Sequence, residues 1–411
     1  MSSTQPYIPR GGGAESPAPY RRGLLSELRI WWREIDRVLL MLIAALMAIG
    51  TVAVAVASPA SADRLSTVET RLPDLYFYWA HLRWQVLGIA VMLGAAMLSR
   101  DNARRVGIVL AVGAIGALFL VPLPGIGYEV NGAQRWLKFG LTVQPSEFLK
   151  PGFAIALAWI LSWKLRDPNI PVQWLASGTM VLVASLLLLQ PNLGATILFG
   201  GVWFVLMLLA GTSIQRIGAL IAAGVGLLTA AYFLYDNARH RIDAFLGGGT
   251  AYDQVDLAQR TLLNGGWTGT GMWLGIRKMK LPEAHTDYIF SVIGEEFGLL
   301  VCALVVLLYL AILMRVLVRL AEEENLFVLL AGAGLATQIC GQAFINILVN
   351  LQLFPSKGMT LPLVSYGGSS TIAVCLTVGL LLAITRRNPF LYRETPGLKA
   401  MLGRSNAVLR T

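Results

Sequence analysis

Ten long apolar stretches constrain this chain more than any other feature of its sequence. A helix needs about 20 mostly apolar residues to cross a bilayer. Of the 411 residues, 56% are hydrophobic and only 14% are charged, which is unlike an ordinary soluble domain. The sequence therefore predicts an all-α integral membrane protein with ten transmembrane helices, at about 38–58, 84–99, 106–123, 148–163, 172–189, 193–211, 217–235, 288–314, 326–348 and 369–385.

Basic residues in the short connections predict the orientation, because Lys and Arg resist translocation. One side of the predicted bundle carries Arg21, Arg22, Arg29, Arg33, Arg37, Arg100, Arg104, Arg105, Lys164, Arg166, Arg216, Arg315, Arg319, Arg386, Arg387 and Arg393. The other side carries Arg64, Arg71, Arg83, Arg135, Lys138 and the basic residues of a long loop, which weigh little in this rule. We therefore expect both termini in the cytoplasm and a large extracytoplasmic loop, residues 236–287, between the seventh and eighth helices.

The ends of the chain differ in composition from its middle. Residues 1–36 begin with a Pro-, Gly- and Ser-rich run without an apolar core, which predicts a disordered cytoplasmic tail. Residues 37–388 form the predicted membrane domain, and 389–411 a second cytoplasmic tail. The net charge of +10 comes mainly from the basic residues that set the topology, and it favours attraction to anionic lipid headgroups. No basic stretch is interleaved with aromatic residues in a soluble module, so we expect no nucleic-acid partner.

The three cysteines indicate neither a disulfide framework nor a metal site. Cys302, Cys340 and Cys375 all fall inside predicted membrane helices, where they behave as small buried hydrophobic residues. Their spacing matches neither a disulfide framework nor a metal-binding motif.

The stretch "RWLKFGLTVQPSEFLK" places polar residues at the outer end of the fourth predicted helix. Pro145 suits the first helical turn, which puts Glu147 and Lys150 three residues apart on one face. They are either an interfacial ion pair that anchors the helix or one wall of a polar cavity. Arg135 and Trp136 are either an aromatic-belt residue with a snorkelling neighbour or part of a site.

Two further connections are polar. "LLLLQPNLGATIL" reads as a tight hairpin turn, although Gln190 and Asn192 could also line a cavity. In the long loop, "DLAQRTLLN" has helical spacing of apolar residues and is followed by glycines. It predicts a short interfacial helix and then a Gly-rich turn, because a structureless segment of this length is uncommon.

"PEAHTDYIFSVIGEEFG", residues 282–298, brings four carboxylates and an imidazole to the mouth of the eighth predicted helix. Asp287 lies where a helix N-terminus favours a negative charge, so a first-turn or capping acid is one reading. His285 is either solvated or orients Asp287. Glu295 and Glu296 lie two turns into the helix, where acids are costly and usually face a polar interior. A structural role would require a basic partner, and this helix offers none before Arg315.

The stretch "NILVNLQLFPSKGMTLPLVSYGGSS" breaks the helical pattern between the last two predicted helices. Its Pro and Gly residues interrupt the backbone, while Lys357, Ser365, Ser369 and Ser370 add polar atoms. Broken backbone at membrane depth is tolerated where it is buried in protein or lines a wet cavity. This pattern favours a functional segment.

Five motifs, "NGAQRWLKFG…QPSEFLK", "QPNLGAT", "NGGWTGTG", "LPEAHTDYIFSVIGEEFG" and the stretch from Ile345 to Ser370, occur in order among the ten predicted helices. Together the chain resembles the SEDS (shape, elongation, division and sporulation) family of peptidoglycan glycosyltransferases, from the first helix to the last. Residues 355–362 and the long cytoplasmic head are more similar to the division members than to the elongation members.

The resemblance implies polymerisation of lipid II into glycan strands, at the outer face of a bacterial inner membrane and at the division septum. It places the family's essential acid on Asp287, and Glu147 and Lys150 in a polar cavity. It also implies a class B penicillin-binding protein as transpeptidase partner, with other division proteins nearby. Where the family often has Asp in its Gln-Pro-Asp turn, this chain has Asn192, so we assign that position no catalytic role.

Glycan polymerisation requires a base for the acceptor hydroxyl and positive charge for the departing pyrophosphate. Asp287 is the candidate general base, and Lys150, Arg135 and Lys357 are the candidate cations. Further candidates for substrate binding are Trp136, Glu147, His285, Glu296, Ser365 and Ser369. No cofactor is required by the motifs, although a divalent cation could assist the pyrophosphate. The alternatives are a lipid II flippase, which would need charges near the bilayer midplane, and a non-catalytic division scaffold.

Overall fold

The computed structural model describes residues 24–67, 70–123, 125–130, 133–139, 141–165, 167–190, 192–236, 239, 240, 243, 250–355 and 358–387. Asp36–Arg386 form one compact unit, and Met1–Ile35 with Arg387–Thr411 form another. In the second unit, residues 24–34 of the predicted disordered tail are helical, as α1 (Leu24–Glu34). Residues 1–23 and 389–411 of the predicted tails lie outside the described residues.

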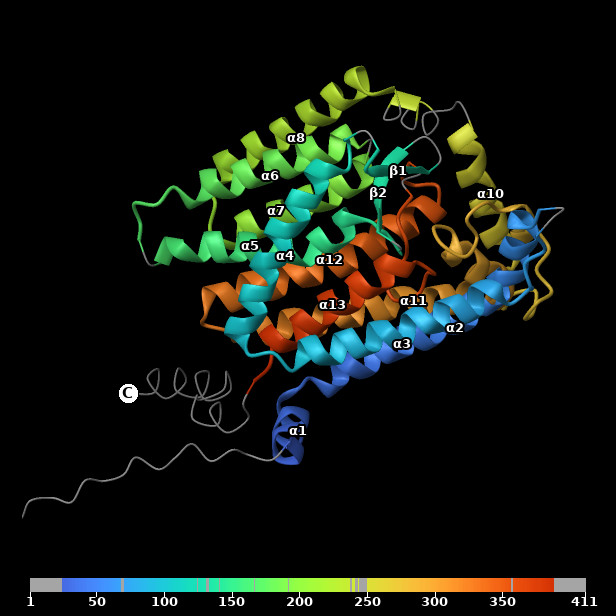
Figure 1. Ribbon diagram of the computed structural model, residues 1–411, viewed down its shortest axis with the longest axis horizontal. Helices are drawn as coiled ribbons and strands as arrows, with labels where there is room; N and C mark the ends of the chain where they lie inside the picture. The colour runs from blue at the N-terminus through green and yellow to red at the C-terminus, as the bar shows by residue number, and fades with distance from the viewer. Residues whose placement is uncertain are drawn as a thin grey trace, which may run out of the picture. The chain divides into compact units, whose positions relative to one another are not determined.

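Helices dominate the larger unit (Figure 1). They are α2 (Arg37–Leu65), α3 (Tyr76–Ala96), α4 (Arg100–Leu120), α5 (Pro145–Ser162), α6 (Val172–Leu189), α7 (Leu193–Leu209), α8 (Ile214–Leu234), α10 (Thr250–Asn264), α11 (Ile289–Leu320), α12 (Leu326–Asn350) and α13 (Gly368–Ile384). Short 3-10 turns follow α5, η1 (Trp163–Leu165), and precede α11, η2 (Arg277–Lys280).

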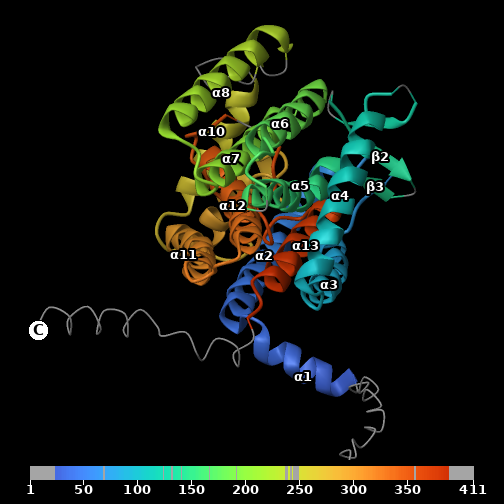
Figure 2. The same cartoon turned by 90° about the vertical axis from the view of Figure 1, so that its left-hand side faces the viewer.

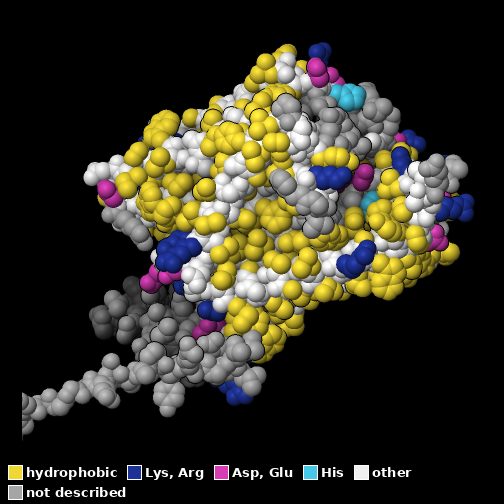
Figure 3. Space-filling model, in the orientation of Figure 1, with side chains coloured by type: hydrophobic (Ala, Val, Ile, Leu, Met, Phe, Trp, Pro, Cys, Tyr) yellow, Lys and Arg dark blue, Asp and Glu magenta, His cyan; other side chains and the backbone are white. Residues whose placement is uncertain are grey.

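Each of the ten predicted membrane stretches coincides with one of these helices. By length and composition, six of the described helices can cross a membrane: α2, α4, α5 with η1, α6, α11 and α12. Helix α7, the part of α8 from Gly218, and α13 are apolar but shorter. Hydrophobic side chains also form large patches on the visible face in Figure 3. The chain is thus a predominantly helical, multi-pass membrane protein, as the sequence predicted.

The predicted boundaries miss where a helix continues through polar residues. Helix α3 begins at Tyr76. The predicted start, at about residue 84, is too late because the first turns of the helix contain the polar residues His81 and Arg83. Helix α11 runs to Leu320, past Arg315 and Arg319. Hydropathy marks the lipid-facing length of a helix, whereas its hydrogen bonds extend beyond that length. The predicted short helix in the long loop is confirmed as α10.

A small antiparallel sheet lies between α4 and α5, and the sequence did not predict it. Its strands are β1 (Gly127–Val130), β2 (Ala133–Phe139) and β3 (Leu141–Val143), in that order. Arg135 and Leu137 are buried on one face of β2, whereas Lys138 is exposed. Alternate residues of a strand point to opposite faces, so β2 fixes the direction in which Arg135 points.

Small residues bring the helices into close contact. A Cβ atom on Gly152 of α5 would lie 2.6 Å from the backbone nitrogen of Ala111 in α4, and one on Gly379 of α13 would lie 2.5 Å from the carbonyl oxygen of Met92 in α3. Such contacts are typical of helix packing in membranes, where close van der Waals contact replaces the hydrophobic driving force. Helix α12 packs against α5, α7, α11 and α13 and is central to the bundle (Figure 2).

Charged residues meet at one end of this unit, which we call the Asp36 end. Asp36 caps α2 by accepting a hydrogen bond from the backbone nitrogen of Leu39 at 3.1 Å. Its carboxylate also pairs with Arg315 at 2.8 Å and Arg319 at 3.1 Å. Arg100 donates to the carbonyl oxygen of Arg386 at 2.7 Å. The structure thus brings together basic residues that the sequence placed on one side. The candidate site lies at the other end of α11 and α12.

Candidate active site

Asp287 lies directly before α11, whose N-cap position is occupied by Tyr288. The side-chain amides of Asn346 and Asn350 on α12 donate to the carbonyl oxygen of Asp287 at 2.8 and 3.1 Å. Asn350 also accepts from the hydroxyl of Ser291 at 2.7 Å. Two amides one helical turn apart therefore fix the backbone that carries the carboxylate.

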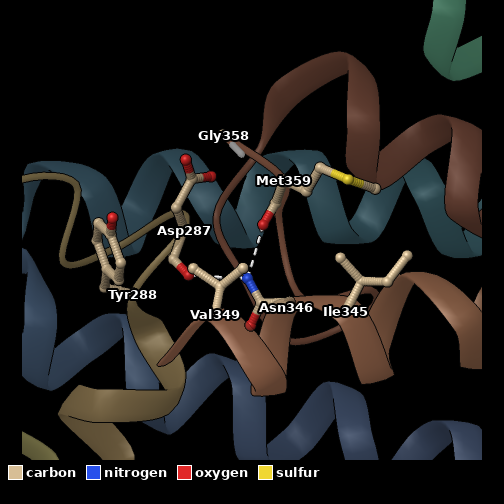
Figure 4. A pocket seen from close by; sticks show the side chains of 7 residues that line it. All are labelled: Asp287, Tyr288, Ile345, Asn346, Val349, Gly358 and Met359. Carbon is tan, nitrogen blue, oxygen red and sulfur yellow. Dashed lines mark hydrogen bonds between the residues drawn. The ribbon is translucent and has the colours of Figure 1, made fainter. Parts of the chain in front are cut away.

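The Asp287 carboxylate is half-buried beside a small cavity (Figure 4). The cavity measures about 10 Å³, room for about one water molecule. Its lining comes from the loop before α11, from α12 and from the segment after α12: Asp287, Tyr288, Ile345, Asn346, Val349, Gly358 and Met359. Gly358 has a φ of +63°, and a Cβ there would lie 3.5 Å from Asp287 Oδ2. The carboxylate therefore stands against backbone in a left-handed conformation that favours glycine.

Hydrogen bonds join the Asp287 segment to the segment after α12. The Ser365 hydroxyl donates to the carbonyl oxygen of Thr286 at 2.6 Å and accepts from the backbone nitrogen of Leu361 at 2.8 Å. The backbone nitrogen of Tyr366 donates to the carbonyl oxygen of His285 at 3.0 Å. Ser365 is 5% exposed, so in this structure it positions the two segments.

Glu147 and Lys150 form a buried ion pair, with 2.6 Å between Lys150 Nζ and Glu147 Oε1. Lys150 Nζ also donates to Gln342 Oε1 of α12 at 2.7 Å. The other Glu147 oxygen accepts from the Ser370 hydroxyl at 2.8 Å, which lies 3.0 Å from the Thr360 hydroxyl. Thr360 accepts from the Gln342 amide through its carbonyl oxygen, at 2.9 Å. These five residues close a ring, the Lys150 ring, across three helices and a loop.

Donor directions in the Lys150 ring follow from the chemistry of its members. A carboxylate only accepts, so Ser370 must donate its single proton to Glu147. Thr360 is then the donor of the Ser370–Thr360 bond. Two of the three Lys150 protons are used by Glu147 and Gln342. The ring is a fixed framework as long as Glu147 is a carboxylate.

The Lys150 ring and Asp287 are linked through α12. Gln342 belongs to the ring, and Asn346 holds both the carbonyl oxygen of Asp287 and that of Met359, the latter at 2.6 Å. The two amides are one helical turn apart, about 6 Å along the axis. The structure therefore brings Glu147, Lys150, Ser365 and Asp287 into one region at this end of the bundle.

Arg135 and Trp136 belong to a neighbouring region. The side chain of Arg135 is buried, and its Nε donates to the carbonyl oxygen of Gln190 at 3.1 Å. Gln190 in turn donates to the carbonyl oxygen of Leu118 at 3.0 Å. Asn192 caps α7 by accepting from the backbone nitrogen of Ala195 at 3.3 Å, which agrees with the predicted hairpin turn. Trp136 pairs with Tyr128 across β1 and β2.

His285 is buried in an aromatic cluster. Its ring centroid lies 4.2 Å from that of Phe77 and 5.3 Å from that of Tyr366. Burial lowers the pKa of His285 from 6.5 to about 4, so the imidazole is neutral at pH 7. Its Nδ1 has no hydrogen-bond partner among the described residues. In this position His285 packs under the Asp287 segment and does not lie in open solvent.

The remaining candidates have different placements. Lys357 lies outside the described residues, directly before Gly358 in the chain. Ser369 is half-buried in the first turn of α13, and its neighbour Ser370 is the residue that joins the Lys150 ring. Sequence reasoning missed the amides of α12, although Gln342, Asn346 and Asn350 recur every four residues and so share one face.

Glu295 and Glu296 lie apart from this region and hold the long loop to α11. Both are fully buried, and Lys278 of η2 pairs with Glu296. Glu295 accepts from the backbone nitrogens of Arg277 and Lys278, both at 2.8 Å. Glu296 accepts from the backbone nitrogens of Trp273 and Gly275 at 2.5 and 3.2 Å. The basic partner that α11 lacks is supplied by the loop, and both oxygens of each carboxylate are engaged by it.

No three His, Cys, Asp or Glu side chains within the described ranges lie close enough together to hold a metal ion. Protein ligands for a divalent cation are thus not assembled there. The assistance of a cation at the pyrophosphate stays a prediction.

Comparisons with known proteins agree with these motifs. The family model of the FtsW, RodA and SpoVE proteins, described as "Cell cycle protein", matches residues 36–389. A Caulobacter vibrioides relative named "Probable peptidoglycan glycosyltransferase FtsW" is 36% identical over 370 residues, covering 89% of this chain and 93% of the relative. A Hahella chejuensis relative of the same name is 36% identical over 353 residues, covering 83% and 87%.

Solved structures share the fold. One chain, from work described as "Structural coordination of polymerization and crosslinking by a peptidoglycan synthase complex", superposes with a TM-score of 0.70 at 27% identity, covering 88% of this chain and all of that one. The rod shape determining protein RodA of Thermus thermophilus superposes with a TM-score of 0.63 at 28% identity, covering 86% and 97%. The chain therefore belongs to the FtsW/RodA/SpoVE family of cell cycle proteins.

Proposed function

We propose that this protein is a peptidoglycan glycosyltransferase that polymerises lipid II, with Asp287 as the general base. The observation that carries the proposal is the placement of Asp287. Its carboxylate is half-buried at a cavity, its backbone is held by Asn346 and Asn350, and Gln342 of the Lys150 ring lies one helical turn from Asn346. A fixed carboxylate at the end of a membrane bundle suits a reaction between a sugar in water and a lipid-linked donor.

The proposed reaction forms one bond and breaks one. The 4-hydroxyl oxygen of the acceptor sugar attacks the anomeric carbon of the donor, and the bond from that carbon to the pyrophosphate oxygen breaks. The hydroxyl proton passes to the Asp287 carboxylate, and the electron pair leaves with the lipid pyrophosphate. A positioned base of this kind contributes about 10²–10⁴-fold to the rate.

Lys150 serves this reaction as part of the framework. It is 3% exposed, and its charge is offset by Glu147 at 2.6 Å. A cation for the pyrophosphate must reach the substrate, so Lys357, next to the cavity residue Gly358 in the chain, is the stronger candidate. Arg135 is buried against the α6–α7 turn and holds that turn in place.

We propose that ten helices cross the membrane, with both termini in the cytoplasm. The end of the bundle that carries Asp287, which we call the Asp287 end, then lies on the outer side. The arginines gathered around Asp36 and Glu323 support it, because the cytoplasmic side carries the excess of Lys and Arg. Fluorescent-protein fusions at both termini should fluoresce, and an alkaline phosphatase fusion after Asn264 should be active. Active phosphatase at either terminus contradicts this orientation.

Polymerisation by the purified protein tests the proposed function. The protein is reconstituted with a class B penicillin-binding protein, which we propose as its partner at the division septum, and with lipid II. Glycan strands are then resolved by size. Wild type should make polymer, and Asp287→Asn should reduce the rate by about 10²–10⁴-fold at equal protein level. The matched control is Asp101→Asn, an exposed acid paired with Arg104, which should polymerise like wild type.

The other outcomes separate the alternatives. A polymerisation rate of Asp287→Asn equal to that of wild type would show that Asp287 is not the general base. Scrambling of lipid II between leaflets without polymer indicates the flippase, and neither activity indicates a scaffold. The ion pairs Glu147–Lys150, Lys278–Glu296 and Asp36–Arg315 each have a buried member and lie towards the helix ends. This placement disfavours transport across the midplane.

A further inference from the structure

The loop between α10 and α11 exposes large apolar side chains. Trp267, Leu274 and Ile276 are 71%, 68% and 76% exposed, and Met272 and Trp273 between them are exposed as well. Soluble surfaces rarely gather so many large apolar side chains in one short segment. We call residues 267–276 the apolar loop.

The apolar loop is hydrogen-bonded into a break in α11. Gly298 has a φ of +84° and interrupts the helix. The backbone nitrogens of Leu299 and Leu300 donate to the carbonyl oxygens of Gly266 and Trp267 at 2.9 and 3.3 Å. In return, Thr270 donates to the carbonyl oxygen of Glu295 at 2.8 Å. Trp267 therefore lies beside Leu300 in space.

Leu300 begins the exposed stripe of α11. Leu304, Leu307 and Met314 continue it at helical spacing, and all are exposed. In a helix long and apolar enough to cross a membrane, such a stripe faces lipid. The apolar loop is thus continuous with a lipid-facing surface.

Two helices give the height of the loop independently. On α2, Val56 lies 20 residues after Asp36, and on α11, Glu296 lies 19 residues before Arg315. Asp36 and Arg315 are paired at one end. At 1.5 Å per residue the α2 count spans about 30 Å, the thickness of the hydrocarbon core, and the α11 count, which crosses the break at Gly298, has about the same length.

Both counts end at the same side chain. Lys278 Nζ donates to the carbonyl oxygen of Val56 at 2.9 Å and pairs with Glu296. This places Lys278 at the edge of the hydrocarbon. Leu300, 15 residues from Arg315, lies about 7 Å inside that edge. Trp267, whose carbonyl oxygen is bonded to the backbone of Leu300, therefore lies just inside the boundary between acyl chains and headgroups, the region where Trp is enriched.

We propose that the apolar loop is inserted into the bilayer leaflet at the Asp287 end, with Trp267, Leu274 and Ile276 in contact with phospholipid. Broken backbone is tolerated at this depth because α11 and the Glu295–Glu296 pair satisfy its polar groups. Exposed Arg277 and Lys280 flank the loop and suit headgroup phosphates. This surface is separate from the Asp287 cavity, and it holds whether or not the protein polymerises lipid II.

Depth measurements on the full-length protein test the insertion. Leu274→Cys and Ile276→Cys are each labelled with a small environment-sensitive fluorophore in phosphatidylcholine–phosphatidylglycerol vesicles without any partner protein. The native cysteines are buried, and the unsubstituted protein gives the labelling background. The matched control is Glu283→Cys, an exposed charged position in the same connection.

The labels at 274 and 276 should be quenched severalfold more strongly by acyl-chain spin labels than the label at 283. They should also be severalfold less sensitive to iodide. Equal iodide access at all three positions, without acyl-chain quenching, overturns the proposal. Shielding that appears only when a partner's soluble domain is added overturns it too and makes the loop a protein-docking surface. Retention of the wild-type melting temperature by each variant shows that the label reports the folded protein.

Discussion

Among single residues, Lys150 has a large expected effect on stability because it is the cation of a buried pair. Its side chain is 4% exposed and that of Glu147 is 12% exposed. Removing one member of a buried pair leaves the other charge uncompensated, which costs about 3–5 kcal/mol, whereas removing both is often close to neutral. The pair and its neutral partners therefore stabilise the site as a unit.

We expect Lys150→Met to lower the free energy of unfolding by about 3–5 kcal/mol and the double variant Lys150→Met/Glu147→Gln to recover most of that loss. Thermal unfolding in detergent measures both. Exposed Lys138→Met provides the control and should stay near wild type. Equal losses in the single and double variants would show that the stranded carboxylate is not the cause.

His285 gives the site a pH-dependent stability. The folded-state pKa of about 4 lies below the ordinary value of 6.5, so between these values the unfolded chain binds a proton that the folded chain does not. Stability from His285 is thus fully present above pH 6.5 and falls as the pH is lowered towards 4. The loss is at most about 3.5 kcal/mol, since one pKa unit corresponds to about 1.4 kcal/mol.

His285→Phe keeps an aromatic ring against Phe77 and removes the titration. Its melting temperature should therefore fall less than that of wild type between pH 6.5 and 4, and exposed His240→Gln should behave like wild type. Parallel acid profiles for wild type and His285→Phe would rule out this contribution.

For single residues, the sequence predicted the contacts whose two partners are close together in the chain. Glu147 and Lys150 are three residues apart, and their pairing follows from helix geometry. Lys278 could not be assigned to Glu296, because the two meet only after the loop folds back onto α11. Ser370 could not be separated from Ser369, since one residue at the start of a helix changes the face by about 100°.

At the scale of elements, the break in α11 is the feature on which the loop depends. A Cβ atom at Gly298 would lie 2.3 Å from the carbonyl oxygen of Trp267, and φ there is +84°. An alanine would be strained by about 1–3 kcal/mol in this conformation and would also collide with backbone. The helix and the loop could then no longer share their hydrogen bonds.

Gly298→Ala should therefore release the loop and raise its cleavage by protease, while Gly94→Ala, in open space on α3, should leave cleavage unchanged. Limited proteolysis with mapping of cuts between 264 and 281 measures the effect. Resistance of Gly298→Ala equal to that of wild type would mean that the break does not hold the loop.

The helices could be predicted because each is an apolar run long enough to show in the sequence alone. The sheet could not, since β1 and β3 have only four and three residues. Such short strands carry too few residues for an alternating pattern, and their stability comes from pairing with β2.

At the scale of the whole molecule, two charged levels bound the membrane unit. Asp36 with Arg315 and Arg319 forms one level, and Lys278 with Glu296 forms the other. Helices α2 and α11 both run between them. The apolar length of the protein is therefore fixed by ion pairs at its two ends and not by the composition of its helices alone.

Lys278 ties two helices at one height, so the protein cannot shorten or lengthen its apolar belt by sliding one helix past the other. The surrounding lipid must adapt instead, at a cost that rises with each ångström of hydrophobic mismatch. In bilayers of phosphatidylcholines of increasing chain length, thermal stability should peak near a hydrocarbon thickness of about 30 Å. Lys278→Met should flatten that peak, and an equally sharp peak in the variant would contradict the role of the tie. A membrane that thins or thickens locally would thus select where this protein resides.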